Sequence, residues 1–335
     1  MQHQYIERES GDIRSEKIFA DRIVKFLYST TRENAPLLFK MLTSAQVSGL
    51  LGYMNYDFPL GTRLTGGRQF LRSLGVDLSE CLDTPEKLNT ARKVFERKIR
   101  YWEFRPMTED FRVIVSPADS KALFGSLYHE SALFLKEKFF SYEELLGGEK
   151  VQWLKSFERG NFAIFRLTPE KYHYSHCPVS GRVVDFYEVQ GQYHSCNPDA
   201  VIAVATPYSK NKRVVTVIDT DVYGGTGVGL VAMIEVVALM IGEVVQAYSE
   251  EKYNTPQSDI HGVFLRKGSP KSLFRPGSST DVLLFQKDRV HFDQDLMTNL
   301  HNRNAYSRFS HGFGVPLVET DLKVRSSIGR ASDIA

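Results

Sequence analysis

Histidine and cysteine side chains are concentrated in two short segments of the sequence. His173 and His176 are three residues apart and Cys177 follows directly, while His194 and Cys196 form a second pair downstream. Imidazole and thiolate groups are the ligands that zinc prefers in proteins. The separation of the two pairs matches no standard zinc pattern, so we predict structural or surface roles for most of these side chains.

A second group of candidates consists of turns that carry a serine or an aspartate. Residues 275–285, RPGSSTDVLLF, place a Gly-Ser-Ser-Thr turn before a hydrophobic strand. A serine on a strained turn can act as a nucleophile, but it needs a base and an oxyanion hole. In residues 115–121, VSPADSK, Asp119 follows a strand and a proline. Taken alone, both segments are equally typical of ordinary turns.

The glycine-rich segment at residues 223–229, YGGTGVG, is a candidate phosphate loop. A dinucleotide-binding loop has the form GxGxxG and lies between a strand and a helix. This segment reads GxGxG, no Lys-Ser/Thr pair follows it, and the next residues, GLVAMIEVVAL, are typical of a strand. We therefore predict a turn between two strands.

The elements that must position these residues change character near Arg105-Pro106. Residues 1–105 are predicted to be mainly helical, because apolar residues recur there at helical spacing. From Phe111 onward, short β-type runs are separated by Gly and Pro, and a helix is expected near 131–146. The runs are FRVIVS, FAIFRL, GRVVDFYEV, AVIAVAT, RVVTVID and DVLLF. The fold class predicted is α+β, with a helical region 1–105 packed on a β-rich domain 106–335 of mostly antiparallel sheet.

Length and composition exclude several classes of protein. The chain has 335 residues, 42% hydrophobic and 24% charged, which is typical of a globular protein. A net charge of +2 gives no reason to expect a nucleic-acid partner, and three cysteines suit a reducing compartment. We find no signal peptide and no apolar run of about 20 residues. The expected location is cytoplasmic, or peripheral on the cytoplasmic face of a membrane.

Taken together and in order, these segments resemble the phosphatidylserine decarboxylase family. VSPADSK resembles the family's S-P-x-D-G, residues 161–183 resemble the strand that leads to D-Y-H-R-x-H-x-P-x-x-G, and residues 274–285 resemble the segment ending in G-S-T and a strand. Further matching segments are FFSYEELLG (139–147), GQYHSCNPDA (191–200), NKRVV (211–215), EVVALMIGEVVQAY (235–248) and VPLVETDLKVRSSIG (315–329). The similarity covers about residues 15 to 330.

The resemblance implies a self-processing enzyme that converts phosphatidylserine to phosphatidylethanolamine and carbon dioxide. In the family, a serine attacks the preceding carbonyl, the ester undergoes β-elimination, and the serine becomes an N-terminal pyruvoyl group. The ketone of that group forms a Schiff base with the substrate amine and accepts the electrons left by carbon dioxide. No metal and no pyridoxal phosphate are expected. The large and small chains would stay together, with a dimer of such heterodimers as the assembly.

The resemblance also assigns roles to individual residues. His176 matches the family's second histidine and is the candidate base. Asp119 matches its buried aspartate and would orient the imidazole of His176. His173 matches its first histidine and would donate a proton to the carbanion or position the reacting groups.

The identity of the pyruvoyl precursor stays open between two serines. Alternation of side chains along the following strand favours Ser279, with cleavage of the Ser278–Ser279 bond. The conformational freedom of glycine favours cleavage just after Gly277, which makes Ser278 the precursor.

Departures from the family pattern keep two other functions open. The family's D-Y-H-R reads Lys171-Tyr172-His173-Tyr174 here, Ser120 replaces the last glycine of S-P-x-D-G, and HGVFLRKGSPKSLF lacks K-G-x-E-x-G-x-F. Arginine is the usual partner of phosphate and carboxylate groups, so its loss favours a soluble pyruvoyl-dependent decarboxylase of a free L-amino acid, such as an aromatic one. A non-catalytic relative would instead bind metal through the histidines and cysteines above. For a phospholipid substrate, the N-terminal helices would supply the membrane contact.

Overall fold

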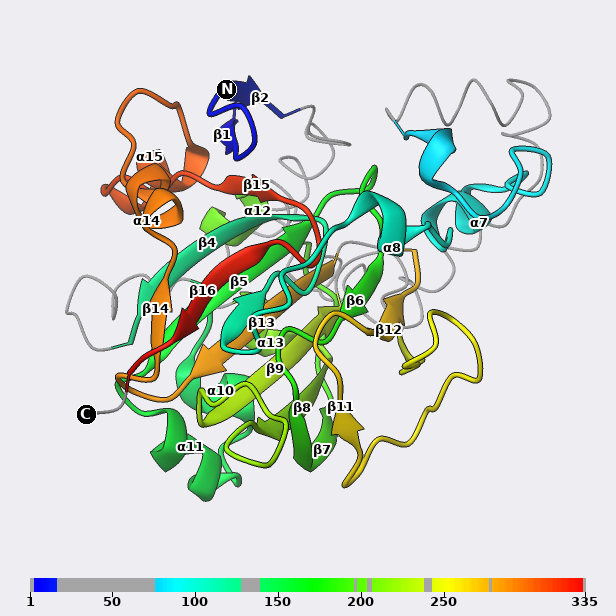
Figure 1. The fold of residues 1–335 in the computed structure, drawn as a ribbon. Helices are drawn as coiled ribbons and strands as arrows, with labels where there is room; N and C mark the ends of the chain where they lie inside the picture. The colour runs from blue at the N-terminus through cyan, green and yellow to red at the C-terminus, as the bar shows by residue number, and fades with distance from the viewer. Residues whose placement is uncertain are drawn as a thin grey trace.

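The computed structural model describes residues 3–16, 76–127, 139–195, 198–203, 207–237, 243–276 and 279–333 (Figure 1). A ten-stranded sheet dominates it, with the strand order β11-β7-β8-β9-β13-β5-β4-β15-β1-β2. Neighbouring strands run antiparallel except β1 and β15, which are parallel. The strands are β1 (Gln4–Glu7), β2 (Ile13–Ser15), β4 (Ser120–Ser126), β5 (Asn161–Leu167), β7 (Gly181–Val189), β8 (Arg213–Asp219), β9 (Leu230–Val237), β11 (Phe264–Leu265), β13 (Ser279–Phe285) and β15 (Thr320–Leu322). The α+β prediction is confirmed.

Two three-stranded sheets accompany the large one. The first has the order β10-β12-β6, and the second has the order β14-β16-β3. Their strands are β10 (Val244–Gln246), β12 (Pro270–Phe274), β6 (Tyr174–His176), β14 (Val290–Phe292), β16 (Ser327–Ala331) and β3 (Val113–Val115). In sequence, β12 and β13 flank the serine turn, yet they belong to different sheets.

The described helices are short, and three of them, η3, α7 and α10, begin at a capping side chain. They are η3 (Leu78–Glu80), α7 (Ala91–Phe95), α8 (Tyr101–Phe104), α10 (Tyr142–Leu146), α11 (Val151–Phe157), α12 (Pro198–Ala203), α13 (Pro207–Lys210), α14 (Gln294–Leu300) and α15 (Arg308–Phe313). The side chain of Thr90 accepts a hydrogen bond from Lys93 N at the start of α7, and Ser141 accepts one from Glu144 N at the start of α10. Near α10, the aromatic rings of Phe140 and Phe162 pack edge to face.

The central strand β13 is buried on both faces. Val282 and Leu284 pack in one apolar cluster, and Leu283 and Phe285 pack in the other. Every residue of β13 pairs with β5 on one side and β9 on the other. Because both faces of the strand are apolar, alternation cannot decide which face is correct, and the sequence argument for Ser279 from alternation loses its force.

Some elements differ from the sequence-based predictions. Residues 4–7 and 13–15 lie within the region predicted to be helical, but they form strands at the edge of the large sheet. The run AVIAVAT was predicted to be a strand, but residues 198–203 form α12, which opens with a proline, a residue favoured in the first helical turn. The glycine-rich segment forms the predicted turn, between β8 and β9. Residues 17–75 and 131–138, where further helices were predicted, lie outside the described ranges.

Candidate active site

The sheet register brings the predicted residues together at one end of the inner strands of the large sheet. Ser279 begins β13 and lies opposite Leu167 at the end of β5 and Val237 at the end of β9. Asp119 directly precedes β4, whose Lys121 pairs with Arg166 of β5. These strand ends therefore place Asp119 and Ser279 at the same end of the sheet.

Backbone hydrogen bonds attach the segment that carries His173 and His176 to the same end of these strands. His176 N donates to Pro117 O at 2.7 Å, next to the segment that carries Asp119. The carbonyl of His173 accepts from Phe274 N at 3.0 Å, at the end of β12 and shortly before the serine turn. The four site residues that the structure describes are thus held by neighbouring backbone segments. Gly277 and Ser278 lie outside the described residues.

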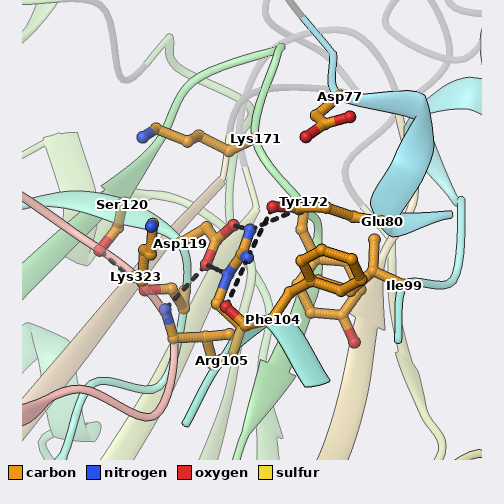
Figure 2. A network of polar contacts seen from close by, with 12 residues as sticks. Asp77, Glu80, Ile99, Phe104, Arg105, Asp119, Ser120, Lys171, Tyr172 and Lys323 are labelled. Carbon is orange, nitrogen blue, oxygen red and sulfur yellow. Dashed lines mark hydrogen bonds and ion pairs between the residues drawn. The ribbon is translucent and has the colours of Figure 1, made fainter. Parts of the chain in front are cut away.

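Asp119 is an ionised carboxylate in a network of charged groups (Figure 2). Arg105 donates from Nε to Oδ1 at 2.9 Å and from Nη2 to Oδ2 at 2.7 Å, and Val324 N donates to Oδ1 at 2.8 Å. Burial opposes ionisation, but the hydrogen bonds and charge of Arg105 outweigh it and lower the pKa of Asp119. Arg105 also contacts Glu80 through two bonds of 3.0 and 2.8 Å.

His176 is a buried, neutral imidazole with both nitrogens in hydrogen-bond contact. Nδ1 lies 2.9 Å from Gly268 O, and Nε2 lies 3.0 Å from the Tyr172 hydroxyl. Burial lowers the pKa of His176 to about 3, so the ring is neutral at neutral pH. The structure differs from the predicted arrangement here, because the Asp119 carboxylate is bonded to Arg105 and Val324 N and not to this imidazole.

The contacts of His176 continue through two tyrosines. The Tyr172 and Tyr253 hydroxyls are 2.7 Å apart, and the Tyr253 hydroxyl donates to Ile99 O at 2.9 Å. This series of hydrogen-bond contacts ends at two carbonyl acceptors, Gly268 O and Ile99 O. Between these two oxygens there are four contacts, each of which needs one proton. A neutral imidazole and two phenols supply only three protons. One of the four contacts is therefore left without a proton when His176 is neutral.

His173 is buried and is also neutral. Its ring stacks on Phe95 with centroids 3.5 Å apart, and neither ring nitrogen has a hydrogen-bond partner among the described residues. Burial, followed by the charge of Arg97, holds the pKa of His173 well below its ordinary value. An unpartnered buried polar group is costly, so its retention is typical of a site that receives a further group.

Ser279 has the same property. Its side chain is buried, and in the described part of the chain Oγ has no hydrogen-bond partner. The neighbouring Thr280 hydroxyl is also buried and without a partner there. The first residues of β13 therefore carry two hydroxyl groups whose hydrogen-bonding capacity no described residue uses.

The possible zinc ligands do not gather in the described structure. His194 Nε2 lies 2.7 Å from Gln192 Oε1, and Cys196 lies outside the described residues. Among the described residues, the group with metal-ligand spacing is instead His3, Glu16 and Glu319. Arg166 is bonded to both of those carboxylates, and Lys121 Nζ lies 3.6 Å from Glu16, so two protein cations already balance their charge.

Several site residues were missed from the sequence. In the sequence, Arg105 marks only the change from helical to β-type patterns, and nothing local links it to Asp119. Tyr172 is part of the histidine motif, but the motif does not indicate that its hydroxyl contacts His176. Lys171 stands where the family has an acid, and its Nζ lies 2.5 Å from Asp321 Oδ1. The charges of Asp321 and Asp119 raise the pKa of Lys171 against the effect of burial.

The fold and this arrangement define an α+β protein with a buried aspartate, two neutral histidines and a serine at one end of the inner strands of a large sheet. Comparison with known sequences gives the family. A sequence model described as "Phosphatidylserine decarboxylase" matches residues 91–305, more than half of the chain. The chain belongs to the phosphatidylserine decarboxylase family, which confirms the resemblance found in the sequence.

Individual relatives are similar over most of their length. A "Phosphatidylserine decarboxylase proenzyme" of Fusobacterium nucleatum is 29% identical over 90% of this chain and 93% of its own. One of Chlamydia trachomatis is 28% identical over 97% of this chain and 96% of its own, and one of Clostridium tetani is 26% identical over 88% and 91%. Within the described ranges, no helix is long and apolar enough to span a bilayer.

Proposed function

We propose that this chain is a self-processing, pyruvoyl-dependent decarboxylase that converts phosphatidylserine to phosphatidylethanolamine and carbon dioxide. The observation that carries the proposal is family membership together with the placement of Ser279, His173, His176 and Asp119 at one end of the sheet. The proteins most similar to this chain are named as proenzymes of this activity. Nothing in the comparisons favours a free amino acid or a metal as the ligand.

The described residues suit the self-cleavage step. A serine hydroxyl becomes a nucleophile when a base takes its proton, and a neutral His176 is in the form that accepts one. Tyr172 and Gly268 hold its ring through both nitrogens. Asp119 contributes its negative charge, which favours the protonated form of His176, while Arg105 holds it in place.

The residues present also fit a pyruvoyl group at the start of β13. The buried Ser279 hydroxyl and both nitrogens of His173 are without partners in the described structure, so polar capacity is available there. The pyruvoyl group supplies an electron sink when the substrate amine is bound to it. His173, neutral and stacked on Phe95, would orient the reacting groups or return a proton to the substrate carbon.

Processing would leave two chains that remain associated. The small chain would begin at Ser278 or Ser279, and its strand β13 lies between β5 and β9 of the large chain. A dimer of such heterodimers and peripheral contact with a membrane remain part of this proposal. The domain division near residue 105 is likewise a proposal.

Intact mass under denaturing conditions tests the chemistry. We expect wild-type protein to give two chains, the smaller beginning with a pyruvoyl group at position 278 or 279. Ser278→Ala and Ser279→Ala are matched controls, because only one of them removes the precursor and should leave a single uncut chain. An uncut wild-type chain, or cleavage elsewhere, would overturn the proposal.

A substrate comparison tests the specificity. Processed protein should release carbon dioxide from phosphatidylserine in mixed micelles and not from free serine or aromatic amino acids. The reverse preference would replace phosphatidylserine with a free amino acid as the substrate.

A further inference from the structure

A group of buried polar side chains lies between the large sheet and the sheet β10-β12-β6. It joins five strands and consists of one lysine, two acids, two serines and a glutamine: Lys271, Glu235, Asp281, Ser175, Ser272 and Gln246. All of them except Gln246 are fully buried. None of the contacts described above involves these side chains. Buried charges are costly unless they are paired, so the cluster requires an explanation.

The lysine of this cluster is matched to one of its two acids. Lys271 Nζ lies 2.6 Å from Glu235 Oε2 and donates to Gln246 Oε1 at 2.9 Å. The Ser272 hydroxyl donates to the other oxygen of Glu235. Glu235 therefore has its counterion in Lys271, whose Nζ bonds to Glu235 and Gln246 and not to Asp281.

Asp281 is the acid without a counterion. It lies directly opposite Glu235 in the register of β13 and β9. Its Oδ2 accepts a hydrogen bond from the Ser175 hydroxyl at 2.7 Å, and its Oδ1 has no partner among the described residues. Burial, followed by the charge of Glu235, raises the pKa of Asp281 well above its ordinary value. Asp281 is therefore an acid whose neutral form is favoured by its surroundings, and a serine of β6 holds it.

The position of this contact relative to the proposed cut gives it a role. β12 ends at Phe274 and β13 begins at Ser279, so residues 275–278 join two different sheets. Cleavage at either proposed bond removes the covalent link from β12 to β13, while other parts of the chain still join the two sheets. The hydrogen bond from Ser175 to Asp281 then runs from the large chain to the small one. Side chains alternate along a strand, so Asp281 and Ser279 lie on the same face of β13.

We propose that Asp281 and Ser175 are positioning residues for the decarboxylation step. In this proposal, which rests on the self-processing described above, their hydrogen bond takes over from the severed peptide link. It holds the start of β13 beneath the segment that carries His173 and His176. Misplacement of a reacting group by about 1 Å can cost on the order of 100-fold in rate. Decarboxylation would therefore be slow if the first residues of the small chain were not held in place.

Kinetics of processed variants test this role. Ser175→Ala and Asp281→Ala should process fully, because the uncut chain keeps its covalent link. Their kcat per processed molecule should then fall by about tenfold to a hundredfold, with KM little changed. Asp281→Asn should retain nearly the wild-type kcat and pH profile, because its amide oxygen can still accept from Ser175.

Ser272→Ala is the matched control. Ser272 lies directly opposite Ser175 in the register of β12 and β6, but it bonds to Glu235 within the large chain. We expect the kcat of Ser272→Ala to stay near the wild-type value. Native mass spectrometry in rising urea should show the large and small chains separating at a lower urea concentration only in Ser175→Ala and Asp281→Ala.

Several results would overturn the proposal. One is a wild-type kcat in both Ser175→Ala and Asp281→Ala, and another is a loss of kcat in Ser272→Ala equal to theirs. A loss of kcat in Asp281→Asn as large as in Asp281→Ala, or failure of Ser175→Ala to cleave itself, would also overturn it. A wild-type protein that is cleaved but does not decarboxylate phosphatidylserine would instead overturn the proposed function.

Discussion

Asp119 and Asp281 are both buried aspartates close to the serine turn, but their surroundings shift their pKa values in opposite directions. Asp119 is bonded twice to Arg105, which lowers its pKa against the effect of burial. Asp281 has a serine as its partner, and burial raises its pKa. The difference shows that a paired guanidinium, and not depth of burial, decides the direction in which the pKa of a buried acid moves here. Asp119 can influence a proton transfer through its charge, and Asp281 can hold a strand in place through its hydrogen bond.

The largest loss of stability should come from removing Arg105, the cation that is paired with Asp119. Arg105→Met leaves Asp119 and Glu80 without their shared partner, and breaking a buried pair on one side typically costs about 3–5 kcal/mol. We expect that loss in urea unfolding of a single-chain background in which both turn serines are alanine. Arg105→Lys keeps the charge and should lose less. A loss under about 1 kcal/mol in Arg105→Met would show that the pair is not a determinant of the fold.

The pH dependence of stability should separate the two aspartates. Asp281 has a raised pKa, so the folded state keeps a proton that the unfolded state releases above the ordinary aspartate pKa. Stability should therefore fall as pH rises through the interval between those two pKa values, by up to about 1.4 kcal/mol per pH unit. Asp281→Asn should remove this slope.

Asp119 should give the opposite slope. Its folded-state pKa is lowered, so its contribution is present above the ordinary aspartate pKa and is lost as pH falls toward the folded-state value. Asp119→Asn should flatten this acid side of the profile and leave the alkaline side unchanged. Urea midpoints of the single-chain background, taken from about pH 3 to pH 8, measure both slopes. If stability depended on pH in the same way in Asp281→Asn and Asp119→Asn, that result would contradict the opposite pKa shifts of the two aspartates.

The smallest effect is expected at the second partner of Arg105. Glu80 is partly exposed, and Glu80→Gln leaves the bonds between Arg105 and Asp119 in place. The expected loss is about 1 kcal/mol or less in the same urea measurement. Glu103→Gln, which removes an exposed pair with Arg100, is the control and should change nothing measurable. A loss as large as that of Arg105→Met would mean that Glu80, and not Asp119, is the main partner.

The sequence was sufficient for the features that depend on local pattern. The strands β5, β7, β8 and β13, and the turn between β8 and β9, follow from β-type runs bounded by Gly and Pro. The family resemblance, carried by motifs in order, was also visible. Short elements were harder, because a four-residue strand such as β1 and a helix such as α12 have too few residues for a clear period.

The features that depend on distant residues were not predictable. The pairs Arg105–Asp119 and Ser175–Asp281 each join different elements, and no spacing in the sequence encodes them. The precursor serine could not be chosen by alternation because both faces of β13 are apolar. A strand with one polar face would have settled its register.

The central position of β13 has a consequence for the life of the processed protein. The small chain would contribute a strand with neighbours on both sides, not one at the edge of the sheet. Releasing it requires breaking two ladders at once, which amounts to unfolding the large sheet. Each pair of chains would therefore be permanent, with no exchange of small chains between molecules. A damaged pyruvoyl group could not be repaired by replacement, and the working life of each molecule would end with its first irreversible chemical error.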